Sequence, residues 1–163
     1  MDGMRNSKTY FTSDTHVGHT NIIRYCQRPF ANAAEMDTAL IENWNARVGD
    51  QDVVYHLGDF TLEGHETARR MFARLRGRIG VLGYPWHHDR GWVPAAFGPS
   101  RFVSASGQLV EILPPLLTIK LPYQGRRQAI AMCHFPLAEW DHRLGGTWHL
   151  HGHSHGRHPP TAG

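Results

Sequence analysis

Strand-like and helix-like patterns alternate along the first half of this 163-residue chain, and this alternation restricts the fold more than any other feature. Short runs rich in strand-forming residues occupy residues 8–13, 52–57 and 78–83. Two segments with apolar side chains at helical spacing, residues 34–48 and 65–77, separate these runs, and each stops at a glycine. A strand–helix–strand–helix–strand order predicts parallel neighbouring strands joined by crossover helices.

The second half of the chain is rich in strands. Strand patterns occur at residues 109–113, 116–121, 127–134 and 148–153, with few helical signals between them. Residues 122–125 (PYQG) predict the turn of an antiparallel hairpin. We therefore expect one α/β domain over residues 1–163, with a second sheet that faces the first.

Composition excludes several classes of protein. The longest apolar runs are too short to cross a membrane, and the N-terminal residues lack the pattern of a signal peptide. Two cysteines, Cys26 and Cys133, argue against a disulfide framework and predict a reducing, cytoplasmic location. The net charge of +3 is scattered, and the arginines of residues 69–78 fit the solvated face of a helix better than a nucleic-acid footprint.

Aspartate and histidine residues gather at or just past the ends of five predicted strands. They are Asp14, His16 and His19; His56 and Asp59; His87, His88 and Asp89; His134; and His151, His153 and His155. The carboxyl edge of an open α/β sheet is where ligands bind. In extended chain, residues i and i+2 point to the same side, so Asp14 and His16 can approach one ion together. Imidazole and carboxylate together suit Zn, Mn, Fe or Ni.

The phrases DTH, GDF, HHDR, CHFP and GHSH occur in this order. This series resembles the calcineurin-like metallophosphoesterase superfamily, whose pattern is D-x-H, G-D, G-N-H-[DE], H and G-H-x-H. The longer phrases YFTSDTHVGHTNII, DVVYHLGDF and WHLHGHSHG resemble its small bacterial and phage-type members, and the resemblance covers about residues 10–156. It implies a four-layer αββα sandwich, in which two mixed β-sheets are flanked by helices. Members of the family commonly continue with further strand after the last motif, which leaves a truncated C-terminus as one alternative.

The resemblance also implies a site with two divalent transition-metal ions, Mn, Fe, Zn or Ni. The first ion would be bound by Asp14, His16 and His155. Asp59 would bridge the two ions, and His134 and His153 would bind the second.

The third motif departs from the family pattern, because the chain reads GYPWHHDR where the family has Gly-Asn-His-Asp. Alignment on the His-Asp pair places His87 at the position of the metal-binding Asn. Alignment on Gly83 would instead use Tyr84, Pro85 and Trp86, whose side chains could do none of the chemistry. We therefore predict that His87 binds the second metal.

The same resemblance implies the catalytic groups. His88 would contact the scissile phosphate and assist the leaving group, and Asp89 would orient His88. His19 and Arg90 are further candidates for substrate binding, although His19 could equally cap the next helix. We expect His56, which lies within its strand, to be a packed core histidine.

The implied function is a metal-dependent phosphoesterase that hydrolyses phosphomonoesters or phosphodiesters by attack of a metal-bridging water. The expected substrate is a nucleotide, a nucleic acid end or a small phosphoester, with no membrane and no obligate protein partner. A metal-dependent amidohydrolase would need a barrel of about 250 residues, which is too long for this chain. The irregular third motif leaves one alternative open, a family member that binds metal or a phosphorylated ligand without turnover.

Overall fold

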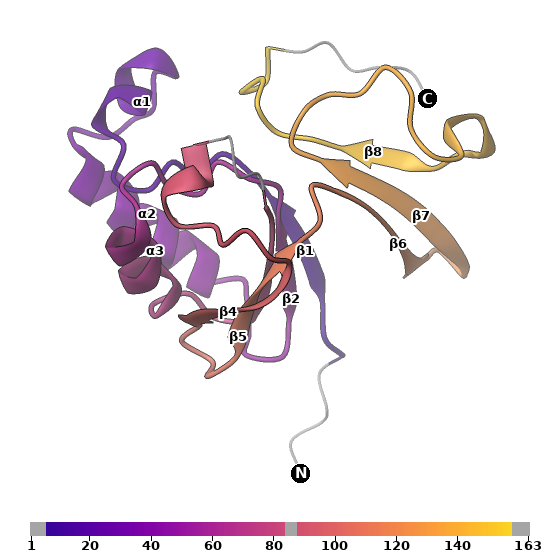
Figure 1. Cartoon of the computed structure of the whole chain (residues 1–163), viewed down its shortest axis with the longest axis horizontal. Helices are drawn as coiled ribbons and strands as arrows, with labels where there is room; N and C mark the ends of the chain where they lie inside the picture. Colours follow the sequence, from indigo (N-terminus) through magenta and orange to yellow (C-terminus); the bar gives the residue numbers. More distant parts are fainter. Residues whose placement is uncertain (1–5, 84–87, 158–163) are drawn as a thin grey trace.

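The computed structural model describes residues 6–83 and 88–157 and contains two mixed β-sheets (Figure 1). The large sheet has the order β1-β2-β3-β5-β4. Its strands are β1 (Thr9–Thr12), β2 (Val53–His56), β3 (Arg78–Leu82), β4 (Gly98–Val103) and β5 (Leu109–Leu113). The first four strands in this order are parallel, and β4 runs antiparallel to β5. The parallel neighbours expected from the first half of the chain are thus confirmed.

The small sheet has the order β6-β7-β8. Its strands are β6 (Leu116–Tyr123), β7 (Arg126–Cys133) and β8 (Trp148–Leu150). Strands β6 and β7 form the predicted antiparallel hairpin, and β8 pairs parallel to β7. The α/β class with two mixed sheets is confirmed.

Three α-helices are present in the described part of the chain: α1 (Thr20–Tyr25), α2 (Ala33–Asn45) and α3 (His65–Phe72). Helix α2 begins after Asn32, whose side chain accepts a hydrogen bond from the Glu35 amide. Helix α3 ends five residues earlier than its sequence pattern predicts, at Phe72. Shorter i+3 bonds, such as the one from the Leu75 amide to the Phe72 carbonyl, turn the chain there and direct it toward β3.

Two apolar cores hold the layers together. Helices α2 and α3 lie on one side of the large sheet and the small sheet lies on the other (Figure 1). Phe60, Phe72 and Val110 belong to the core on the helical side. Leu82 and Met132 belong to the core between the two sheets.

The expected fourth layer is not found among the described residues. All three α-helices precede β4, and the only helical turn between β7 and β8 is the short 3-10 segment η2 (Arg143–Gly145). This connection is interrupted by left-handed backbone at His142 and Gly146, which a continuous helix excludes. The layers that the structure describes are therefore helix, sheet and sheet.

Two short elements were not expected from the sequence. Helix α1 has six residues, of which only Ile22 is buried, so no helical stripe marks it. Strand β4 begins at Gly98, and only its residues Ser100 and Phe102 are buried, so its alternating pattern is short. None of the helices in the described ranges combines the length and apolar character needed to span a bilayer.

The strand registers bring the ends of several strands to one edge. In the large sheet, Thr12 pairs with His56 and His56 pairs with Val81. The loops that follow β1, β2 and β3 therefore begin side by side. In the small sheet, the Gly152 amide donates to the His134 carbonyl at 2.9 Å, just beyond the ends of β7 and β8.

Candidate metal centre

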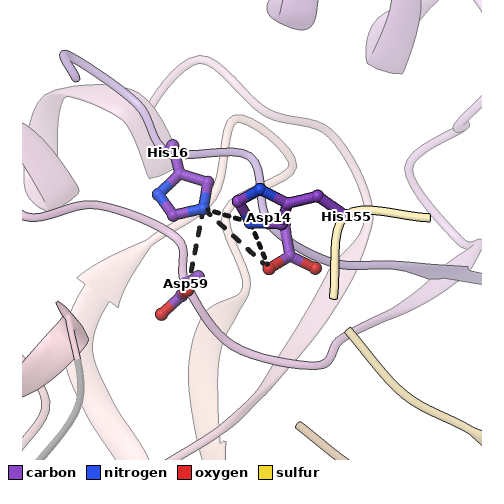
Figure 2. Close-up of side chains that lie close together, drawn as sticks. All are labelled: Asp14, His16, Asp59 and His155. Atoms are coloured by element: carbon purple, nitrogen blue, oxygen red, sulfur yellow. Dashed lines mark hydrogen bonds and ion pairs between the residues drawn. The ribbon is translucent and has the colours of Figure 1, made fainter. Parts of the chain in front are cut away.

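The first candidate metal-binding group consists of Asp14, His16, Asp59 and His155 (Figure 2). One ligand atom from each of these residues lies within 4.8 Å of all the others. His155 Nε2 lies 3.3 Å from Asp14 Oδ1, and His16 Nε2 lies 3.6 Å from Asp59 Oδ2. The side chains come from three loops, which follow β1, β2 and β8.

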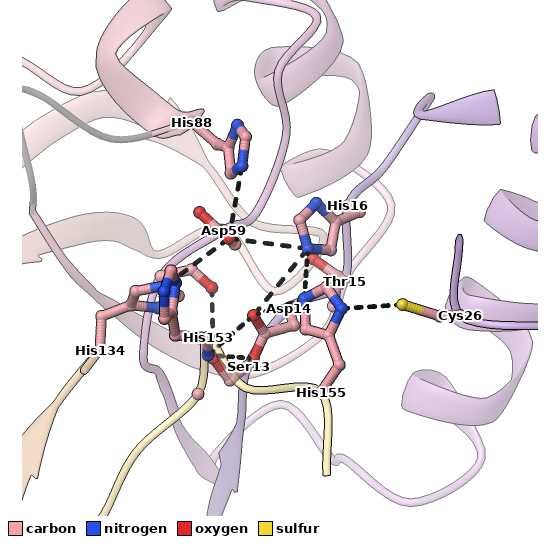
Figure 3. A network of polar contacts seen from close by, with 12 residues as sticks. Ser13, Asp14, Thr15, His16, Cys26, Asp59, His88, His134, His153 and His155 are labelled. Carbon is pink, nitrogen blue, oxygen red and sulfur yellow. Dashed lines mark hydrogen bonds and ion pairs between the residues drawn. The ribbon is translucent and has the colours of Figure 1, made fainter. Parts of the chain in front are cut away.

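The second group consists of Asp59, His134 and His153, with ligand atoms again within 4.8 Å of one another (Figure 3). His134 Nε2 lies 3.5 Å from Asp59 Oδ2, and the rings of His134 and His153 are 5.3 Å apart. Asp59 is the residue common to both groups in the described part of the chain, so its carboxylate is placed to face two ions at once.

The chemistry of these groups fits divalent transition metals. Burial lowers the pKa of His16 to about 3, against the opposing effect of the Asp59 and Asp14 carboxylates. At neutral pH the ring is therefore uncharged and has a lone pair to offer. His16 Nε2 and His155 Nε2 face each other at 3.1 Å, beside two carboxylates. A cation satisfies such converging lone pairs, and the mixed nitrogen and oxygen donors suit Zn, Mn, Fe or Ni.

The backbone at the candidate ligands is unusual. Five of the candidate ligands have left-handed φ: Asp14 (53°), His16 (52°), Asp59 (56°), His153 (67°) and His155 (47°). Residues other than glycine rarely adopt this conformation. Such strain persists where the surrounding structure imposes it, which is a common property of functional sites.

His88 lies at the exposed side of this centre. It sits on the 3-10 turn η1 (His88–Gly91), its side chain is 43% exposed, and its Nε2 is 3.9 Å from Asp59 Oδ2. Its ring is 5.6 Å from that of His16. His88 is therefore close to both groups without belonging to either. His87, the predicted replacement for the family's Asn, lies outside the described residues.

The two other candidates for substrate binding differ in position. The ring of His19 lies 5.6 Å from that of His16. His19 occupies the N-cap position of α1, but its side chain makes no capping hydrogen bond, so the structure supports its place near the site over the capping role. Arg90 is exposed on η1, and within residues 6–83 and 88–157 no contact joins its side chain to the metal-binding groups.

The role of Asp89 in orienting His88 stays a prediction, and the hydrogen bonds described for its carboxylate are with other groups. Asp89 is buried, and its Oδ1 accepts hydrogen bonds from the amides of Phe60 and Thr61 and from Trp92 Nε1, at 2.9, 3.0 and 2.9 Å. The 3-10 turn directs the Asp89 side chain inward while His88 points to the site. Asp89 thus fixes the backbone that follows Asp59. Burial raises its pKa to about 6, and these hydrogen bonds oppose that rise.

His56 is the packed core histidine that the sequence predicts. It is fully buried, its Nε2 lies 3.0 Å from Thr15 Oγ1, and its Nδ1 accepts a hydrogen bond from the Gly58 amide. It braces the loops that present Asp14 and Asp59.

No protein-family model matches the chain. The chain is 34% identical over 157 residues to the uncharacterized protein MJ1445 of Methanocaldococcus jannaschii, an alignment that spans 95% of this chain and 73% of the relative. The chain belongs to the MJ1445 family. It is also 28% identical to the Gene 66 proteins of Mycobacterium phages D29 and L5, over 93% and 91% of its length and 80% and 78% of theirs.

One solved structure resembles this member of the MJ1445 family. It is the crystal structure of the protein of unknown function AQ665 from Aquifex aeolicus, with a TM-score of 0.55 and 23% sequence identity. The match covers 86% of this chain and 67% of that one. At this identity the likeness supports the fold alone.

Sequence reasoning missed two residues that contact the centre of this MJ1445-family chain. Cys26 and Arg28 follow α1 and contact His155 and the backbone of Asp14, respectively. Both lie in the phrase YCQRPF, directly after the long N-terminal motif. Their nearness to that motif in the sequence could have indicated a role at the site. Their positions could not be predicted, however, because helix α1 was not expected from the sequence.

Proposed function

We propose that this protein is a dinuclear metal-dependent phosphoesterase related to the calcineurin-like metallophosphoesterases. The observation that carries the proposal is the position of Asp59, which is shared by two groups of potential ligands. A carboxylate between two such groups sets the spacing of a metal pair, which is the arrangement that phosphoester hydrolysis uses. The order of the motifs along the chain supports the same assignment.

The cofactors in this proposal are two divalent ions of Mn, Fe, Zn or Ni. Asp14, His16 and His155 would hold one, and His134 and His153 the other. When bound, such a pair neutralises the phosphoryl oxygens and supplies a nucleophilic water at neutral pH. We propose His87 as a further ligand of the second ion.

His88 would hold the proton that the leaving oxygen needs. Its side chain is partly exposed and lies beside Asp59 without belonging to a metal-binding group. A histidine in this position can donate from Nε2 to an oxygen that departs from phosphorus. His19 lies on the same side of His16 as a candidate contact for the phosphate.

The fold is consistent with this proposal. Two facing mixed sheets with helices on one outer face match the inner layers and one outer layer of the αββα sandwich. We propose that the chain has this sandwich architecture, reduced by one helical layer in the described part.

The decisive experiment is a substrate panel assayed on protein of known metal content. The protein is loaded with Mn²⁺ or Zn²⁺, desalted and analysed for metal, and then tested on phosphomonoesters, phosphodiesters, nucleotides and nucleic acid ends. We expect bound metal and metal-dependent hydrolysis of at least one class. Bound metal without turnover of any substrate would favour the non-catalytic alternative, and a metal content near zero would refute the metal centre.

A further inference from the structure

The segment that follows helix α1 contacts the backbone of the first metal-binding group. Arg28 is partly buried, and its guanidinium donates from Nη2 to the Asp14 carbonyl at 2.6 Å and from Nη1 to the Thr15 carbonyl at 2.8 Å. These carbonyls belong to the turn that presents Asp14 and His16, where the backbone is left-handed. A planar guanidinium can bond two consecutive carbonyls at once, so it holds the turn in one conformation.

Two residues earlier, Cys26 contacts another member of the same group. Its Sγ lies 2.8 Å from His155 Nδ1 (Figure 3). The opposite ring nitrogen, Nε2, faces Asp14 and His16. When Nδ1–H donates to the sulfur, the lone pair of Nε2 is left facing the other ligands. In that tautomer the contact holds the ring in the orientation that a metal ligand requires.

A third contact fastens the segment that carries His155. Arg157 Nη2 donates to the carbonyl of Tyr25 at 3.0 Å. Tyr25, Cys26 and Arg28 thus contact the turn after β1 and the loop after β8, which are more than a hundred residues apart in the sequence.

We infer that Cys26 and Arg28 are positioning residues for the first metal site, Cys26 through the His155 ring and Arg28 through the backbone of Asp14 and Thr15. This inference rests on the proposed metal centre but not on the identity of its substrate. It predicts that the two residues control metal affinity and coordination, even though neither belongs to a group of potential ligands.

The test for Cys26 is a Co²⁺ titration of the whole chain, followed by visible absorption and by dialysis. Cys26→Ala removes the acceptor for Nδ1–H, and loss of such a partner weakens metal affinity by about 10–100-fold. We expect that loss for one of the two ions, with an altered absorption spectrum. Cys26→Ser keeps an acceptor and should recover part of the affinity and the parent spectrum, which a merely structural role would not predict.

Arg28 is tested in the same way against a matched control. Arg28→Gln should weaken the first site, and Arg28→Lys should recover only part of the affinity because one ammonium group cannot reproduce the fork. Arg24→Gln is the control, since Arg24 lies on α1 and stacks over Tyr25, and no hydrogen bond or ion pair joins its side chain to the ligand loops in the described ranges. Circular dichroism of the metal-free variants checks that each one folds.

The possible failures can be told apart. A parent protein that binds no Co²⁺ would overturn the metal centre together with this inference. A parent that binds two ions, with unchanged affinity and spectrum in Cys26→Ala and Arg28→Gln, would overturn only the positioning roles.

Discussion

The main-chain amide of His153 donates hydrogen bonds to both carboxylate oxygens of Asp14, at 3.0 and 3.2 Å. This contact joins the loop after β1 to the loop after β8. It is close because the preceding residue is Gly152, where a Cβ would collide with Ser13 Oγ and Asp14 Oδ2. The approach of the two ligand loops therefore depends on the absence of one side chain.

Gly152→Ala should separate these loops and weaken binding of the first ion by at least about tenfold, because even outer contacts of a metal site are worth that much. The measurement is a metal titration on folded protein. Gly145→Ala is the control, because a Cβ there meets only His142 at 3.7 Å. Equal affinity in the two variants would show that the loops can rearrange around the added methyl group.

Single ligand changes should remove single ions. His155→Ala and His153→Ala should each lower the metal content from about two ions per chain to about one, because each side chain belongs to a different group. Elemental analysis after loading and desalting measures this directly. If both variants lose both ions, the two groups act as one site.

Asp59→Asn should reduce turnover more than His16→Ala or His155→Ala, because Asp59 alone belongs to both groups. We expect turnover to fall by more than about 100-fold, which is the largest loss typical for removal of a group that hydrogen-bonds to a metal ligand. The measurement is hydrolysis of a chromogenic phosphodiester at saturating metal. Near-normal activity of the Asp59 variant would contradict the bridging assignment.

His88→Ala should lower turnover while leaving the metal content unchanged. A general acid contributes about 10²–10⁴-fold, and it matters most for a leaving group that departs poorly without a proton. The loss should therefore be larger for alkyl phosphoesters than for nitrophenyl phosphoesters. An equal loss with both kinds of substrate would assign His88 to phosphate binding instead.

The stability of the metal-free protein should fall as the pH decreases from 6.5 toward 4. Burial lowers the pKa of His56 from 6.5 to about 4, so the folded state excludes a proton that the unfolded state binds in this range. Above pH 6.5 the ring is neutral in both the folded and the unfolded state, and the full stability is present. This stability is lost as the pH falls from 6.5 through about 4. The free energy of unfolding, measured in urea and plotted against pH, should have a slope for His56→Asn that is flatter than that of the parent by up to about 1.4 kcal/mol per pH unit. Parallel pH profiles for the parent and the variant would contradict this.

The sequence was sufficient to bring the candidate ligands to one edge of the fold. Asp14, His16 and Asp59 directly follow parallel strands, and the ends of such strands must meet. The hydrogen bonds of Asp89 were not predictable, because only the 3-10 turn after β3 directs its carboxylate to the amides of Phe60 and Thr61.

The contact of Cys26 with His155 could not be predicted from the sequence either. It depends on a six-residue helix that lacks a hydrophobic stripe and on a sequence separation of 129 residues. The outer helical layer was expected from a resemblance, and the connection between β7 and β8 has glycines and left-handed backbone instead. Local pattern thus predicted the strands other than β4, together with their ends, whereas packing decided the rest.

The left-handed backbone of the candidate ligands lowers the stability of the fold at the positions proposed to bind metal. Each such residue other than glycine costs on the order of 1 kcal/mol, which the rest of the fold must offset. Replacing His153 by glycine should therefore relieve strain as it removes a ligand, and the variant should melt at a higher temperature than His153→Ala in the absence of metal. Selection for thermal stability alone would favour glycine at these positions, which is a residue that cannot bind a metal through its side chain.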